Sequence, residues 1–307
     1  MRDERLDAMR GAACVLVVLD HALIYTFGWD WFAGSLIGRM IMALDMPAFA
    51  FVAGYFFKPD LKRKLLALGL PYLLWTLIWN WRTPLDHLHA LWDPYGSQLT
   101  WHHPWFLYVL LLCCVLGMLP RNMQWAVAGM CIALKAYGVD GHLFGLAGVL
   151  WLFPAFLGGQ EMHRSDLSRL SLVAVPVFAA SLYIPPTLNL VTAVASLVLS
   201  MAAGVLTLYN APRFLAPIGR RSLGVWLAHG WFLHFGLGTG WEMALTKTAI
   251  ALGAAFVVAW LLERNQWSAA ILLGRRWPKK PLGDVHGRAN DTVRSQDGVP
   301  QPEAGSA

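Results

Sequence analysis

The sequence predicts an all-α polytopic membrane protein, a bundle of about ten transmembrane helices with both termini in the cytoplasm. Hydrophobic residues make up 57% of its 307 residues and charged residues only 14%, whereas a soluble domain carries about 25% charged residues. Sixteen tryptophans are present, a number typical of aromatic belts at two membrane surfaces. The basic residues lie in short gaps between apolar segments and not on one soluble face, which argues against nucleic-acid binding.

Apolar segments of membrane-crossing length, about 17–25 residues, recur along the chain. The fifth and seventh of them are short, and either is compatible with a tilted or re-entrant helix. We place the spans at 9–27, 36–57, 65–81, 104–120, 123–138, 142–160, 170–185, 187–209, 221–238 and 246–263.

The distribution of basic residues supports this number of spans. With the N-terminus inside, the cytoplasmic segments hold 20 of the 24 Lys and Arg residues, and the outer side keeps Arg39, Arg82, Lys135 and Lys247. Such an excess of cytoplasmic positive charge sets the orientation of membrane proteins. One span missed or added would degrade the asymmetry.

The chain divides into three parts by composition. Residues 1–263 form the predicted transmembrane domain. Residues 264–281 are basic and apolar, as expected of a helix at the inner membrane surface. Residues 282–307 are polar and predict a disordered cytoplasmic tail.

The first span carries the main candidate for chemistry. His21 lies near its outer end, eleven residues after Arg10, with Arg5 further toward the cytoplasm. Eleven helical residues rise roughly 16 Å, which suits a long phosphate-bearing donor held by an arginine at one end and reacting at a histidine at the other. Two simpler interpretations stay open: the arginines mark the cytoplasmic end of a helix, and a neutral His21 bonds a neighbouring carbonyl. As a functional residue, His21 would be a general base, because imidazole titrates near neutral pH.

Two carboxylates are candidate partners of this histidine. Asp45 lies within the second span, in the outer half where an antiparallel neighbour would meet His21, so we expect it to orient the imidazole. A helix-packing hydrogen bond is the alternative. Asp20 precedes His21 and would point about 100° away from it on a helix, so the two are not expected to line one narrow site equally well.

Basic residues also follow the second span. Lys58, Lys62, Arg63 and Lys64 form a cytoplasmic cluster that suits the phosphates of coenzyme A or, alternatively, an anchor to lipid headgroups. The four cysteines all lie in apolar segments and form no Cys-x-x-Cys pattern, so we predict neither a metal site nor a disulfide framework.

Two further regions are candidates for the acceptor side. His229 follows Arg220 and Arg221 into the ninth span and could line the same cavity as His21 or serve helix packing, and His234 lies nearer the outer end. The outer loop 81–103 is rich in His, Trp and Asp, which suits either a cover over a substrate site or a solvated cap.

Five short motifs, in order, resemble the acyltransferase-3 family of bacterial membrane O-acyltransferases, which includes fucose 4-O-acetylase-like and exopolysaccharide acetyltransferases. The resemblance covers about residues 5–262, and two departures stand out, Ala53 where Ser is usual and Asp45 before Met46-Pro47. The motifs are RLDAMRGAACVLVVLDH, MPAFAFVAGYFF, PYLLW, PWFLYVLLL and GRRSLGVWLAH.

The resemblance implies ten spans, a cytoplasmic acyl-coenzyme A donor and an acceptor hydroxyl on the far side of the membrane. It implies that His21 is catalytic and that Arg10 is associated with it, with Arg5 and Arg63 in basic motifs. We therefore expect a bacterial inner-membrane enzyme that moves an acyl group, with acetyl-coenzyme A as donor and no metal, to a sugar hydroxyl of a glycan. The expected donor-binding residues are Arg5, Arg10, Arg63 and Lys64, and Trp105 and His229 are expected at the acceptor.

Several alternatives remain open at this stage. A transporter or flippase for a lipid-linked sugar or small metabolite would also use intramembrane ionisable residues, although no paired halves are visible in the sequence. A non-catalytic subunit of a polysaccharide assembly complex is the third possibility. The sequence does not decide between acetyl and succinyl, between exopolysaccharide, O-antigen, periplasmic glucan and a macrolide-like acceptor, or between monomer and dimer.

Overall fold

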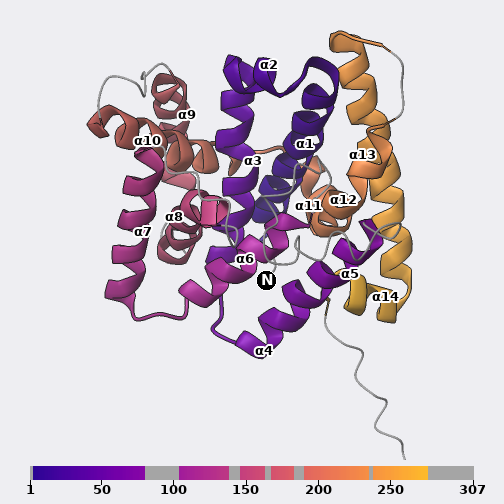
Figure 1. Ribbon diagram of the computed structural model, residues 1–307, viewed down its shortest axis with the longest axis horizontal. Coiled ribbons are helices and arrows are strands. Elements are labelled where there is room, and N and C mark those ends of the chain that lie inside the picture. The colour runs from indigo at the N-terminus through magenta and orange to yellow at the C-terminus, as the bar shows by residue number, and fades with distance from the viewer. Residues whose placement is uncertain are drawn as a thin grey trace, which may run out of the picture.

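The computed structural model describes residues 3–79, 104–137, 146–162, 167–182, 190–234 and 238–275. These residues form helices and short connections, and no strand occurs among them. The prediction of an all-α membrane protein is therefore confirmed. Figure 1 shows α2 at one end of the bundle and α4 and α14 at the other, the ends predicted to be outer and inner.

Every predicted span contains at least part of one helix. Among the described residues three helices, α1, α3 and α13, are long and apolar enough to cross a membrane, and the total number of spans stays a prediction. The elements that correspond to the spans are α1 (Glu4–Phe27), α3 (Leu36–Tyr55), α4 (Leu61–Lys64) continued by a π-helical turn (Leu65–Gly69) and α5 (Leu70–Trp79), α6 (Trp105–Leu116), α7 (Arg121–Ala136), α8 (Leu146–Met162), α9 (Leu167–Ser181), α10 (Leu190–Leu208), α11 (Ala216–Arg220), α12 (Ser222–Ala228) and α13 (Trp241–Arg264).

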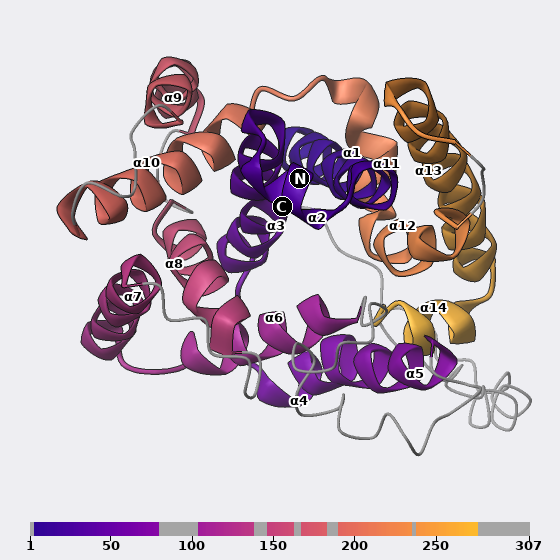
Figure 2. The same ribbon diagram turned by 45° about the horizontal axis from the view of Figure 1, so that its top comes forward.

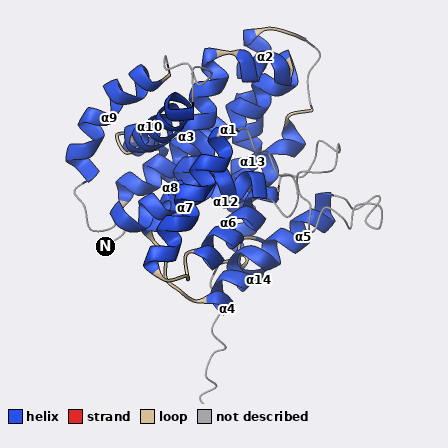
Figure 3. Ribbon diagram, turned by 60° about the vertical axis from the view of Figure 1, so that its left-hand side comes forward, coloured by secondary structure: helices blue, strands red, loops and turns tan. Residues whose placement is uncertain are grey.

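Helices α1 and α3 lie between the other elements, with α7 to α10 on one side and α11 to α14 on the other (Figure 2). Helix α1 begins at Asp3, whose carboxylate accepts hydrogen bonds from the backbone N–H groups of Arg5 and Leu6. It ends at Gly28, whose positive φ of 86° stops the helix. The same arrangement, turned so that α9 and α10 come forward, is seen in Figure 3.

Helix α1 packs on α11 with almost no space between the two backbones. A Cβ atom added to Gly219 would lie 1.7 Å from the carbonyl oxygen of Asp7, and one added to Gly11 would lie 2.1 Å from that of Leu215. Only glycine permits this approach, which is how helices in membranes gain van der Waals contact. The N-terminal half of α1 is thereby fixed against the segment that leads into α12.

The ninth predicted span, 221–238, is wrong as a continuous helix. Its described residues form α12 (Ser222–Ala228) and a 3-10 turn (His229–Phe232), and α11 precedes the span, separated from α12 by the non-helical Arg221 (φ −111°, ψ 8°). The two short helices serve different neighbours: Gly219 packs on α1, whereas a Cβ on Gly224 would lie 2.7 Å from Ala259 of α13. One straight helix could not satisfy both contacts.

Two further helices flank the predicted spans. Helix α2 (Trp29–Gly34) was not expected, and it joins α1 to α3. Helix α14 (Gln266–Leu272) lies within the segment 264–281, where we predicted a helix at the membrane surface. The outer loop 81–103 and the tail 282–307 lie outside the described residues.

Candidate functional site

His21 lies on α1 with a defined ring orientation. Its Nδ1 is 2.8 Å from the carbonyl oxygen of Val17, one turn earlier. A carbonyl only accepts, so Nδ1 carries the proton and the neutral imidazole keeps its lone pair on Nε2. The side chain is 24% exposed, so the ring is accessible to a substrate. The hydrogen bond to a neighbouring carbonyl, which we expected of a histidine with a structural role, is present. The same hydrogen bond leaves Nε2 as the basic atom.

A second histidine lies beside His21. The ring of His229 meets that of His21 edge to face, with centroids 5.0 Å apart and planes 72° apart. His229 is fully buried, and its Nδ1 donates to the carbonyl oxygen of Trp226 at 2.5 Å. The start of the chain and the 3-10 turn after α12 thus bring two imidazoles together.

Asp20 lies beside this histidine. Its Oδ2 is 3.4 Å from Nδ1 of His21, which differs from the expectation that neighbouring side chains on α1 would diverge. The reason is that Nδ1 is the ring nitrogen nearer the backbone, within reach of the preceding residue. Asp45 is buried on α3, accepts from the N–H of Met46 at 2.5 Å, and lies within electrostatic range of Asp20. That Asp45 orients His21 stays a prediction.

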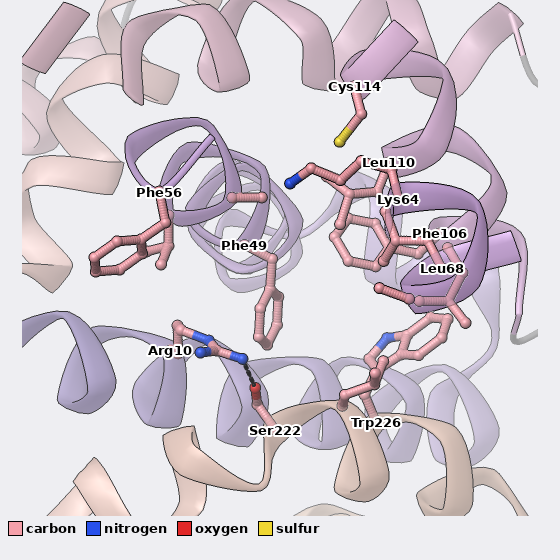
Figure 4. A pocket seen from close by; sticks show the side chains of 15 residues that line it. Arg10, Phe49, Phe56, Lys64, Leu68, Phe106, Leu110, Cys114, Ser222 and Trp226 are labelled. Carbon is pink, nitrogen blue, oxygen red and sulfur yellow. Dashed lines mark hydrogen bonds between the residues drawn. The ribbon is translucent and has the colours of Figure 1, made fainter. Parts of the chain in front are cut away.

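A cavity of about 270 Å³ lies near Arg10, toward the N-terminal end of α1 from this histidine pair. Arg10 stands on one wall, where its Nη2 donates to Oγ of Ser222 at 2.9 Å, and Lys64 lies across the cavity beyond Phe49 (Figure 4). Most of the remaining lining is apolar, from Val52, Ala53, Phe56, Ala67, Leu68, Phe106, Leu107, Leu110, Cys114, Leu223 and Trp226. The cavity therefore offers two cations and an otherwise mainly apolar lining.

Neither histidine lines the cavity, and Trp226 lies between the cavity and the histidine pair. This residue lines the cavity, and its carbonyl oxygen accepts the hydrogen bond from His229. Its ring also packs against Phe106, with centroids 5.6 Å apart. The wall of the cavity is thus directly linked to the ring that contacts His21.

The other predicted residues lie away from this lining. Arg5 is exposed, with its guanidinium 5.7 Å from the ring centroid of Tyr209, and Arg63 is exposed on α4. Trp105 is partly buried at the start of α6 and packs on Phe106. Of the predicted donor-binding residues, Arg10 and Lys64 line the cavity within the described part of the chain.

Sequence reasoning missed three residues of this site. Ser222, which accepts a hydrogen bond from Arg10, and Trp226 both lie in the GRRSLGVWLAH motif. The motif pointed to this segment, but the sequence did not show which residues it would contact. Asp20 was considered and set aside on helix geometry alone. Among the described residues no group of three or more His, Cys, Asp or Glu side chains could hold a metal ion.

A family of known proteins matches most of this chain. The family model for acyltransferase-3, described as an acyltransferase domain, matches residues 3–264. No curated protein and no solved structure matches the chain. The match spans α1 to the end of α13, and therefore includes both histidines, both cavity cations and Ser222. It favours a membrane O-acyltransferase over a transporter, and the chain belongs to the acyltransferase-3 family.

Proposed function

We propose that this protein transfers an acetyl group from cytoplasmic acetyl-coenzyme A to a sugar hydroxyl of an exported or cell-surface glycan, in the inner membrane of a bacterium. The reaction class follows from the family. The identity of the donor, the identity of the acceptor and the location in the bacterial inner membrane are our proposals. The observation that carries them is one helix, α1, with a cation at a cavity near its inner end and a histidine pair toward its outer end.

The donor would enter from the cytoplasm. Arg10 and Lys64 would bind its phosphates, because both line the cavity and cations bind phosphate oxygens through charge-assisted hydrogen bonds. The apolar lining suits the pantetheine arm, which has few charges. Eleven residues of α1 separate Arg10 from His21, roughly 16 Å, a distance that the arm can bridge. Arg5 and Arg63, exposed at the same membrane face, would attract the donor at longer range.

His21 would act as general base. Its Nε2 lone pair takes the proton of the acceptor hydroxyl while the hydroxyl oxygen attacks the carbonyl carbon of the thioester. The tetrahedral intermediate collapses as the carbon–sulfur bond breaks. Nε2 of His21 gives its proton to the departing sulfur of coenzyme A. The products are an acetyl ester and free coenzyme A, and His21 returns to its neutral form.

His21 suits this role better than His229 because its side chain is partly accessible, whereas His229 is fully buried. The carboxylate of Asp20, 3.4 Å from Nδ1, would stabilise the imidazolium once the proton is taken. His229 packs edge-on against the same ring and would hold its orientation. Asp45 would contribute to the same polar group from α3. Trp105 and the outer loop 81–103 would shape the acceptor side.

The test is acetyl transfer by membranes that contain the protein, with radiolabelled acetyl-coenzyme A and surface glycan as acceptor. We expect His21→Ala to lower the rate by about 100- to 10,000-fold, the contribution of a general base. Thr26→Ala is the matched control, because Thr26 lies on the same helix and its hydroxyl donates to the backbone of that helix, at the carbonyl oxygen of Ala22, 2.7 Å away. Normal transfer by His21→Ala at normal protein level would refute the proposal.

A further inference from the structure

Three polar side chains form a second group beyond His21, toward the outer surface. Tyr25 of α1 and His234 meet edge to face, with ring centroids 5.1 Å apart. Lys247 of α13 lies within electrostatic range of His234. We call these three residues the outer cluster. Tyr25 lies more than 200 residues before the other two in the sequence.

The outer cluster lies about one helical turn from His21. Tyr25 follows His21 by four residues, a rise of about 6 Å. Ala251 of α13 packs in one apolar cluster with Val18 and Ala22 of α1. Ala244 packs with Leu23, so the two helices run antiparallel. Lys247, one turn before Ala251, therefore lies level with the outermost turns of α1.

Lys247 has an unusual position for a charged residue. It is only 8% exposed, although a lysine in the outer part of a spanning helix could extend to the membrane surface. Among the described residues no carboxylate lies within 4 Å of its ammonium group. A buried ammonium without a carboxylate is expensive. An anionic ligand at this position would offset that cost.

We propose that the outer cluster binds the carboxylate or phosphate of an acidic acceptor, so that the glycan acetylated by this enzyme contains acidic sugars. This proposal rests on the proposed function, which places the acceptor on the outer side of His21. The Lys247 ammonium, the His234 imidazole and the Tyr25 hydroxyl are all able to donate hydrogen bonds. An acidic group held there would place a hydroxyl of the same sugar one helical turn inward, at His21.

The experiment measures binding without any donor, so that it does not depend on catalysis. The purified protein in phosphatidylcholine nanodiscs is titrated with methyl glucuronide and with methyl glucoside, its neutral counterpart. We expect the glucuronide to bind at least tenfold more tightly. Lys247→Gln should abolish the difference, and Lys247→Arg should keep it. Lys135→Gln is the matched control, since it removes an outer positive charge from α7, far from α1 in the fold.

Each result decides the proposal. Equal binding of the two sugars, or no binding of either, would overturn it, as would a preference that survives Lys247→Gln. If Lys247→Gln unfolds the protein, His234→Gln replaces it, because His234 is exposed and its loss should reduce the preference at least threefold. Loss of the preference in nanodiscs that contain phosphatidylglycerol would identify a lipid headgroup as the anion and overturn the acceptor assignment. His21→Ala should abolish transfer and leave this binding intact, which separates failure of the proposed function from failure of this inference.

Discussion

The two ends of α1 are built differently. At the inner end, Gly11 and Gly219 bring the backbones of α1 and α11 into contact, and Arg10 is tied to Ser222. At the outer end the contacts include polar and aromatic side chains, among them His21 and His229, beside small apolar clusters. Backbone contact fixes the end that we propose binds the donor, because glycines leave no freedom to adjust. The end that we propose reacts depends on rings and carboxylates whose positions a single substitution can change.

The largest effect on the inner end is expected from Gly219→Val. The added side chain would meet the carbonyl oxygen of Asp7, since a Cβ there is already only 1.7 Å away. We expect a loss of about 3 kcal/mol in the free energy of unfolding, the upper range for overpacking. Thermal unfolding in detergent measures it. Gly253→Val on α13 is the control, because a Cβ there meets no atom within 4 Å, and equal destabilisation by both variants would contradict the tight contact.

The next effect separates binding from chemistry. Arg10→Ala should raise the KM for acetyl-coenzyme A about 30-fold with a smaller change in kcat, because a charge-assisted hydrogen bond contributes about 2 kcal/mol. Initial rates at varied donor concentration measure the two constants. Arg39→Ala, an exposed arginine on the outer part of α3, should change neither. A fall in kcat with an unchanged KM would place Arg10 in the chemical step. The inner and outer ends of α1 would then no longer divide into donor binding and reaction.

A smaller effect is expected at the reacting end. Asp20→Asn should lower kcat about tenfold and leave the donor KM unchanged, because it removes the carboxylate beside Nδ1 of His21 and so weakens stabilisation of the imidazolium. Its readout is the pH dependence of kcat. The rise of kcat with pH should move toward lower pH in the variant, because without the neighbouring carboxylate His21 releases its proton more easily. An unshifted profile would show that the base does not depend on this carboxylate. Asp45→Asn is made in parallel, and a larger loss there would assign the orienting role to Asp45.

The smallest effect is expected from Ser222→Ala. It removes the hydroxyl that accepts from Arg10 at 2.9 Å and leaves the guanidinium in place. A single hydrogen bond contributes about 1 kcal/mol, so the donor KM should rise about fivefold. Combined with Arg10→Ala, the serine variant should add little, because the two residues act through one contact. Full additivity would show that Ser222 acts independently of Arg10.

The sequence by itself determined the helical membrane architecture and the order of the segments. Long apolar stretches and flanking cations are properties of local composition, so they predict membrane-spanning helices without any knowledge of tertiary contacts. The spacing of Arg10 and His21 was equally local, because both stand on one continuous helix.

Only the tertiary structure decided which residues meet. His229 reaches His21 across 208 positions of the sequence, and Ser222 reaches Arg10 across 212. The break at Arg221 arises because α11 packs on α1 while α12 packs on α13, a conflict between two contacts that no local pattern reveals. Side-chain direction also decided the place of Asp20, which helix periodicity alone had set aside. Periodicity fixes where each Cβ points, but the reach of a side chain to a ring nitrogen depends on rotamers that the packed neighbours select.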